Sequence, residues 1–518
     1  MTTKSFIRGT MILIIAGMIT RVLGFINRII VARVMGEEGV GLYMMALPTL
    51  FLLITLTQIG LPIAISKRVA EADATKNRKK IKQIISISLL IITCTSIFFT
   101  IVIILFAPVI ADHLLTDSRT LYPIYAIAPI VPVIALTSVI KGYFQGVQNM
   151  KPQSAAIIIE QTIRIIAVFL LVSYLVPYGI EFAATGAMIS VLIGEAASLL
   201  YLIYLFKRKK VVKVRQRFFA NLKGSKQTGK DLFSIAIPNT GSKLISAITN
   251  FLEPIIVAQS LTYAGITVEN ATKQYGELTG FAMPLLFLPS FITNSLSIAL
   301  VPAISEAEAK DSMEHVHYRI TQAVRISFAS GALATIIFSL FSIPILTYMY
   351  DSSNASRYII LMAPFFLLLY IQAPLQAALF ALDYAKQAMW NSFIGAIFKF
   401  AVLIFLASNA TYGIMGVAIA ISASVVLITF LHLHALNKAI QFKITLKDTL
   451  KMCTLLLVTY ISGYVLKILF GDAVNEIFYL LIIFFILSII YLINLFLLKF
   501  ITKAELKQIP YIQQLFNN

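Results

Sequence analysis

The sequence predicts an all-α polytopic membrane protein, and three observations lead to this fold class. Of its 518 residues, 59% are apolar and 13% are charged, whereas a soluble domain has about 45–50% apolar and about 25% charged residues. Mean hydropathy is +0.88. The apolar runs last about 20 residues, the length at which an α-helix crosses ~30 Å of hydrocarbon. Transmembrane β-strands would alternate over about 10 residues, so a porin is excluded together with a soluble enzyme and a secreted disulfide scaffold.

The apolar runs predict 14 transmembrane helices, with boundaries good to a few residues. The first follows Lys4 and Arg8, but it is too long and too interrupted by arginine for a cleavable signal peptide. An even number of spans places both termini on the same side of the membrane. In chain order the spans lie near 9–32, 40–62, 84–107, 122–146, 154–176, 182–206, 232–261, 278–303, 326–350, 358–380, 388–409, 412–436, 452–470 and 477–498.

Lysine and arginine indicate which side that is. Of the 42 residues of these types, 31 lie in the N-terminal segment, the even-numbered loops and the C-terminal tail. This asymmetry predicts that both termini are cytoplasmic in a bacterial cell membrane. It also explains the net charge of +19 by topology and attraction to anionic lipid rather than by nucleic-acid binding. The odd-numbered loops hold only Arg33, Arg119, Lys273 and Arg357.

An internal repeat divides the predicted spans. Ile29–Ala32 recurs as Ile255–Ala258, and Leu61–Ala72 recurs in similar form as Leu296–Ala307, at offsets of 226 and 235 residues. Ala128-Pro129 and Tyr178–Ile180 recur at nearly the same offset. Six spans per copy predict two parallel six-helix lobes, a transporter architecture. The expected domains are an N-lobe (1–206), a basic cytoplasmic linker (207–231), a C-lobe (232–436), and the last two helices with a cytoplasmic tail (437–518).

Ionisable residues inside the spans indicate a cavity or structural ion pairs. Arg21 and Arg28 lie about 20° apart around the first helix, so they share a face. Glu160 and Arg164 have the i, i+4 spacing of an ion pair. Cations in the spans outnumber acids, which predicts a water-filled, net-positive cavity for an anionic ligand that arginine holds well. The expected substrate-binding cations are Arg21, Arg28, Lys243 and Lys399, and the expected structural or cavity charges are Glu160, Arg164, Glu195 and Glu253.

Prolines in the seventh and eighth spans are candidate hinges, because freed backbone groups must be satisfied inside protein or a cavity. They are Pro238, Pro254, Pro284 and Pro289.

No cofactor and no metal site is predicted. The stretch Gly224–Asp231 resembles a P-loop but lacks its Ser/Thr and a preceding strand. The i, i+2 spacing of His432 and His434 separates the two rings around a helix, as does that of the other such pair.

Several strings resemble the polysaccharide-flippase branch of the multidrug/oligosaccharidyl-lipid/polysaccharide (MOP) exporter superfamily. They include Arg21-Val-Leu-Gly-Phe25, Gly36–Met45 and Lys273–Met283, and the resemblance covers essentially the whole chain. It implies two lobes that open as a V, with two further helices that form a groove for a lipid tail. It also implies an undecaprenyl diphosphate-linked cargo, and the longer strings imply a peptidoglycan precursor for the spore cortex. Arginines of the first span face the cavity in such flippases; Arg21 matches one of them, and Asn27 takes the place of another.

These inferences predict a flippase that works by alternating access rather than an enzyme, with peptidoglycan synthesis enzymes as possible partners. Other functions stay open: a flippase for a different lipid-linked polysaccharide, a cation-coupled drug exporter, or a non-transporting scaffold for sporulation. A membrane glycosyltransferase or polymerase is disfavoured, because its carboxylates would need a sizeable outer loop. The predicted loop between spans 3 and 4 offers only Asp112 and Asp117.

Overall fold

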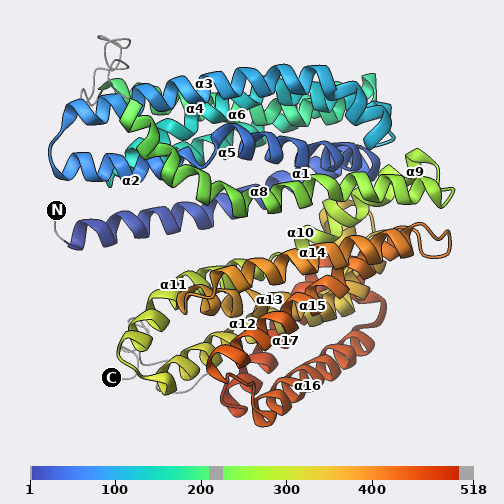
Figure 1. Ribbon diagram of the computed structural model, residues 1–518. Helices are drawn as coiled ribbons and strands as arrows, with labels where there is room; N and C mark the ends of the chain where they lie inside the picture. Colours follow the sequence, from blue (N-terminus) through green and yellow to red (C-terminus); the bar gives the residue numbers. More distant parts are fainter. Residues whose placement is uncertain (1–2, 209–225, 501–518) are drawn as a thin grey trace. The chain divides into compact units, whose positions relative to one another are not determined.

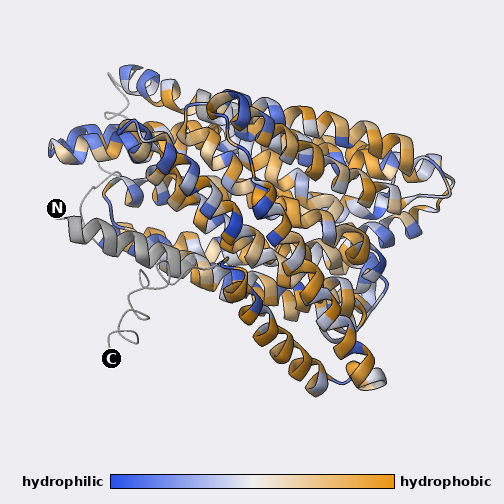
Figure 2. Ribbon diagram, turned by 90° about the horizontal axis from the view of Figure 1, so that it is seen from below, coloured by the Kyte–Doolittle hydropathy of each residue, from blue (hydrophilic) through white to orange (hydrophobic). Residues whose placement is uncertain are grey.

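The computed structural model describes residues 3–208 and 226–500, and within these ranges the ordered elements are all helical (Figure 1). Twelve helices there are long and apolar enough to cross a membrane, and a bent pair, Val268–Leu286 with Ser290–Ala309, makes thirteen if it is one span. Apolar residues cover these helices, and hydrophilic residues gather at the connecting turns (Figure 2). The predicted all-α polytopic fold is confirmed, and the predicted number of fourteen spans is consistent with these helices. Most of the basic linker 207–231 and the C-terminal tail fall outside the described residues.

Two compact units make up the chain, Met1–Gly280 and Phe281–Asn518. This boundary lies later than the linker at which the repeat divides the sequence, because α8 and α9 pack against α1. The division of the repeat into lobes therefore stays a prediction. The main helices of the first unit are α1 (Thr3–Gln58), α2 (Leu61–Ala74), α3 (Arg78–Pro108), α4 (Leu121–Gly146), α5 (Lys151–Leu175), α6 (Ile180–Arg208), α8 (Lys226–Tyr263) and α9 (Val268–Gly276).

Helix α1 contains two of the predicted spans. It is broken at Gly36, whose φ of 67° and ψ of −172° are not helical. Such a conformation suits glycine, because a side chain at positive φ is strained. The break therefore separates the segment that carries Arg21 and Arg28 from the second predicted span.

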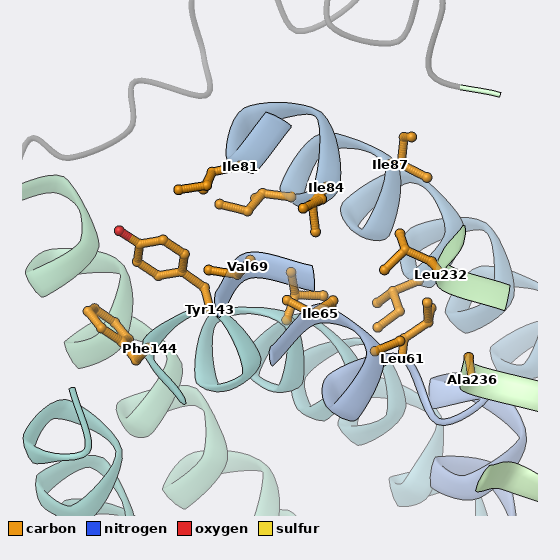
Figure 3. Packing of buried hydrophobic residues seen from close by; sticks show 14 of the residues in the cluster. Leu61, Ile65, Val69, Ile81, Ile84, Ile87, Tyr143, Phe144, Leu232 and Ala236 are labelled. Atoms are coloured by element: carbon orange, nitrogen blue, oxygen red, sulfur yellow. The ribbon is translucent and has the colours of Figure 1, made fainter. Parts of the chain in front are cut away.

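The second span does not end in a loop, as the sequence predicted, but continues after a turn as α2. Leu61, Ile65 and Val69 are spaced by four residues and are fully buried, so they form an apolar stripe along one face of α2. This stripe packs against Ile84 of α3 and Tyr143 of α4 (Figure 3). Lys67 and Arg68 lie between the apolar positions and lower the mean hydropathy of the segment, so hydropathy alone did not predict this helix.

Ion pairs join helix ends and turns of the first unit in two places. In the first, Lys80 lies 3.5 Å from Asp231. In the second, Arg119 bridges Asp117 and Glu38. Thr272 of α9 donates to Asp117 over 2.7 Å in that same place. Each group of contacts joins segments that the predicted spans assign to the same side of the membrane, and the second group gives Asp117 a structural role.

Cysteine labelling tests the predicted orientation. In a variant without Cys94 and Cys453, Asn270→Cys should react with a membrane-impermeant reagent in intact cells, because its loop is expected outside. Lys76→Cys should react only after the cells are opened. Asn270 and Lys76 are both exposed, so a difference in labelling would report the side of the membrane and not burial of the side chain. The opposite pattern would reverse the topology.

The second unit holds α10 (Met283–Leu286), α11 (Ser290–Ala309), α12 (Met313–Tyr350), α13 (Ser356–Ala381), α14 (Ala385–Ala407), α15 (Ile414–Ile440), α16 (Leu446–Phe470) and α17 (Ile477–Leu497). The last two of these pack against each other and against α12. Ring contact between Phe341 and Phe484, with centroids 5.7 Å apart, is part of this packing.

Lys467 of α16 satisfies a carbonyl that a proline frees in α12. Pro344 has no N–H to donate to the carbonyl of Leu340, four residues earlier. The helix is distorted there, with φ −123° and ψ 22° at Phe341. The Lys467 ammonium donates to the Leu340 oxygen over 2.9 Å. A freed backbone group in hydrocarbon is costly, so this bond fixes α16 to α12.

The four candidate hinge prolines fall in two different settings. Pro238 and Pro254 lie within α8, which is helical throughout its length. Pro284 lies in α10, and Pro289 is the last residue of the turn 287–289 that separates α10 from α11. The hydroxyl of Tyr370 donates to the Leu286 carbonyl at this turn, over 2.7 Å. Movement at either pair stays a prediction.

Candidate functional site

A cavity of about 390 Å³ lies inside the first unit. Its apolar wall comes mainly from the second half of α1, and its polar groups come from α1, α5 and α6. The backbone of Gly280, in a π-helical turn (Glu277–Ala282), closes part of it. The polar side chains that line the cavity are Asn27, Arg28, Tyr43, Glu160, Gln161, Arg164 and Glu195.

Close packing of α6 on α5 brings the charges together. A Cβ on Gly194 would lie 2.8 Å from the Glu160 carbonyl oxygen and 3.1 Å from the Arg164 Cβ. Only glycine fits there without a shift, and it sets the next residue, Glu195, beside Arg164. Substitution by alanine would therefore push α6 away from the charged groups.

Four residues from three helices form what we term the charged cluster: Lys141, Glu160, Arg164 and Glu195. Arg164 Nη2 lies 2.7 Å from Glu160 Oε1, which is the pairing that the i, i+4 spacing predicts. Lys141 Nζ of α4 lies 3.6 Å from Glu160 Oε2. The distance from Arg164 Nη2 to Glu195 Oε1 is 4.0 Å. Lys141 was not among the expected site residues, and its partner Glu160 lies on a different helix.

Several polar atoms that line the cavity have no protein partner among the described residues. They are the Oδ1 atom of Asn27, the Nε atom of Arg164 and the Oε2 atom of Glu195, all buried. Arg28 also has no carboxylate within ion-pair distance in the described parts of the chain, and its side chain is exposed to the cavity. Unpartnered buried polar atoms are costly, so these groups suit water or a polar ligand.

The structure brings together only some of the residues expected at an anion site. Arg28 and Arg164 line the cavity, whereas Arg21 is exposed on α1 and is not part of its wall. Lys243 and Glu253 lie on α8, and neither lines the cavity. In the second unit, Lys399 of α14 lies 5.1 Å from the ring centroid of Phe400 and has further interactions of its own.

The charge of the cavity is smaller than the sequence predicted. Two arginines and two glutamates line it, so the formal charges of these lining residues sum to zero. Lys141, which pairs with Glu160 but does not line the cavity, adds one positive charge. The sequence argument counted cations over the whole chain, and only the fold decides which of them share a cavity. Arg28 supplies the one lining cation without an internal partner in the described chain.

A second hollow, apolar and of about 570 Å³, lies within the second unit. Helices α12, α13 and α16 form its walls. Only the two hydroxyls of Thr335 and Ser339, the Tyr460 side chain and Cys453 interrupt the apolar lining, which otherwise consists of Ile336, Pro364, Leu367, Leu456, Leu457 and Ile461. We term it the apolar groove.

Solved structures with this fold define the class of protein. An inward-facing multidrug resistance MATE family transporter of the MOP superfamily matches 82% of this chain and 94% of its own, with 16% identity and a TM-score of 0.68. The lipid II flippase MurJ, in an inward closed conformation, matches 93% of this chain and 97% of its own, with 18% identity and a TM-score of 0.67. The chain is thus a multi-pass membrane protein with the MOP transporter fold.

Sequence comparison then gives the family. Residues 6–308 match the polysaccharide biosynthesis protein family, and the chain belongs to it. Stage V sporulation protein B of Bacillus subtilis is 49% identical over 99% of this chain and 99% of that protein. The lipid II flippase MurJ of Bacillus subtilis is 25% identical, over 90% of this chain and 88% of that protein.

Proposed function

We propose that this protein is a flippase that carries an undecaprenyl diphosphate-linked peptidoglycan precursor of the lipid II type from the cytoplasmic to the outer leaflet. The observation that carries the proposal is the cavity of the first unit, which is lined by Arg28 and by three residues of the charged cluster. The likeness to stage V sporulation protein B supports a place in spore cortex synthesis. No reacting group is required, because the cargo leaves chemically unchanged.

The diphosphate would bind between Arg28 and Arg164. Arg28 presents a planar guanidinium that can hold two phosphate oxygens at once, and Arg164 has an Nε–H that the cluster leaves unused. The carboxamides of Asn27 and Gln161 line the same space and suit the sugar hydroxyls or phosphate oxygens. Such contacts offset the loss of phosphate hydration on leaving water.

Arg21 has a different part in this proposal. It lies on the same face of α1 as Arg28, two turns closer to the N-terminus, about 10 Å along the axis at 1.5 Å per residue. If the N-terminus is cytoplasmic, Arg21 meets an incoming headgroup before Arg28 does. It would increase the rate of capture rather than hold the bound state.

The lipid tail would lie in the apolar groove of the second unit. Its lining matches a hydrocarbon chain in chemistry, and α16, one of the two helices outside the repeat, forms one wall. The transmembrane potential, about 2.3 kcal/mol per charge per 100 mV, favours outward movement of the anionic headgroup.

Native mass spectrometry of the purified protein tests the cargo. The expected result is a co-purifying polyprenyl diphosphate-linked disaccharide-pentapeptide. A different lipid-linked glycan would replace lipid II in the proposal, and absence of any polyprenyl diphosphate together with no transport of labelled lipid II in proteoliposomes would contradict it.

Arginine variants test the headgroup site. Arg28→Ala should lower lipid II transport in proteoliposomes at least tenfold, about the effect of one charged hydrogen bond of 1.5–3 kcal/mol. Arg28→Lys should restore only part of it, because an ammonium lacks the planar fork. Arg208→Ala, at the exposed end of α6, serves as a control of equal charge. Normal transport by Arg28→Ala would remove Arg28 from the site.

Filling the apolar groove tests the tail site. Leu456→Trp should reduce the amount of co-purifying lipid severalfold, because the indole would occupy part of the apolar groove. Leu469→Trp makes the same change on α16 at a side chain that is 73% exposed, outside the groove. Equal lipid content in the two variants would argue against this location of the tail.

A cation-coupled drug exporter is the second candidate, because a MATE transporter shares the fold and because two carboxylates line the cavity. Such a pump should confer resistance to cationic drugs and should not need lipid II. Drug efflux by the protein without lipid II transport would favour it.

A further inference from the structure

One carboxylate oxygen in the cavity has no donor. Glu195 is 8% exposed, and its Oε2 atom is buried without a hydrogen-bond partner among the described residues. Its other oxygen is 4.0 Å from Arg164, at the limit of ion pairing, while the same guanidinium binds Glu160 at 2.7 Å. An ionised carboxylate needs donors when it is buried, whereas a carboxyl group carries its own proton and needs fewer.

The groups around Glu195 come from each long helix packed against α6. Helix α5 presents the Glu160–Arg164 pair, α4 presents an ammonium, and α1 presents a guanidinium and a phenol across the cavity. Two cations of the cluster thus face two carboxylates, and the second carboxylate is the less well bound. The ionisable groups that face Glu195 are Arg28, Tyr43, Lys141, Glu160 and Arg164.

We propose that Glu195 binds a proton from the water of the cavity, and that this proton controls how strongly the cavity binds an anion. With Glu195 ionised, the charged cluster is formally neutral and Arg164 faces two carboxylates. With Glu195 protonated, the net charge of the cluster rises by one, and Arg164 faces a single ionised carboxylate, that of Glu160. The proton returns to water when Glu195 ionises, and no other bond is made or broken.

The proposal rests on the anion site of the proposed function and adds its regulation. Because linkage is reciprocal, an anion that binds more tightly to the protonated form must in turn increase proton binding at Glu195. Binding of the headgroup at near-neutral pH should therefore be accompanied by proton uptake. The unused Nε–H of Arg164 gives the anion a donor that does not require breaking the Glu160 pair.

Calorimetry on the full chain in nanodiscs tests the inference, with a farnesyl diphospho-sugar as the probe. This probe is a diester, so it lacks the ionisation near pH 6 that a terminal phosphate would have. The wild type should bind it at least tenfold more tightly at pH 6 than at pH 8, because one unit charge at roughly 10 Å and an effective dielectric constant of about 20 gives about that factor for each negative charge of the probe. Heats measured in buffers of different ionisation enthalpy should reveal proton uptake.

Two variants separate Glu195 from other carboxylates. Glu195→Gln should bind with the low-pH affinity at both pH values and take up no proton. Glu181→Gln changes a carboxylate of the same helix that does not line the cavity, and it should keep the wild-type pH dependence. Equal pH dependence in the wild type and in Glu195→Gln would overturn the inference and leave the proposed function standing.

Infrared spectroscopy of the ligand-free wild type provides a measurement that requires neither probe nor variant. A protonated carboxyl band should lose intensity between pH 6 and pH 8. If this band titrates but the probe does not bind at any pH, the proton site stands and the anion site of the proposed function fails. If no such band titrates, the proton site is wrong.

Discussion

Arg164→Gln is expected to destabilise the protein more than any other single change in the charged cluster. It leaves Glu160 and Glu195 with Lys141 as the one remaining cation of the charged cluster, and Lys141 is within ion-pair distance of Glu160 alone in the described chain. Removing one partner of a buried ion pair costs about 3–5 kcal/mol. The thermal unfolding temperature of the purified protein should fall by several degrees, and the amount that accumulates in membranes should drop.

The double variant Glu160→Gln with Arg164→Gln tests whether this loss comes from an uncompensated charge. Removing both partners of a buried pair is often nearly neutral, so the double variant should be more stable than Arg164→Gln alone. Arg21→Gln is the matched control: it removes a cation of α1 that is exposed and has no carboxylate partner in the described chain. A double variant as unstable as the single one would show that the pair is not the cause.

Lys467→Met is the second change with a large expected effect. The side chains are similar in length, so the main loss is the hydrogen bond to the Leu340 carbonyl, which Pro344 cannot replace. A buried acceptor left without a donor costs about 1–3 kcal/mol. The contact of α16 with α12 should loosen, which limited proteolysis and thermal unfolding would both detect.

Adding Pro344→Ala to Lys467→Met should recover part of the lost stability. Alanine restores an N–H at the position from which a regular helix donates to the Leu340 carbonyl. The two changes should therefore be non-additive, as expected for groups that share one acceptor. Lys447→Met, at an exposed position in the first turn of α16, should have little effect. Strict additivity would mean that the lysine stabilises the protein in another way.

The sequence alone determined the class of fold, because hydrophobic length is a property of each segment by itself. Runs of about 20 apolar residues predicted helices that cross a membrane, and these helices are present. The i, i+4 spacing of Glu160 and Arg164 predicted their ion pair for the same reason: both groups lie on one helix, so local geometry sets their distance.

Only the tertiary structure decided which of the charges share a cavity. Arg21 and Arg28 look equivalent on a helical projection, yet only Arg28 lines the cavity, and Arg21 lies exposed two turns away on α1. Glu195 joins Glu160 and Arg164 because Gly194 lets α6 approach α5 closely, and Lys141 joins them from α4. Likewise, the bond from Lys467 to a proline-freed carbonyl spans 127 residues. Contacts between helices depend on which faces pack together, and a segment's own hydrophobicity does not encode that choice.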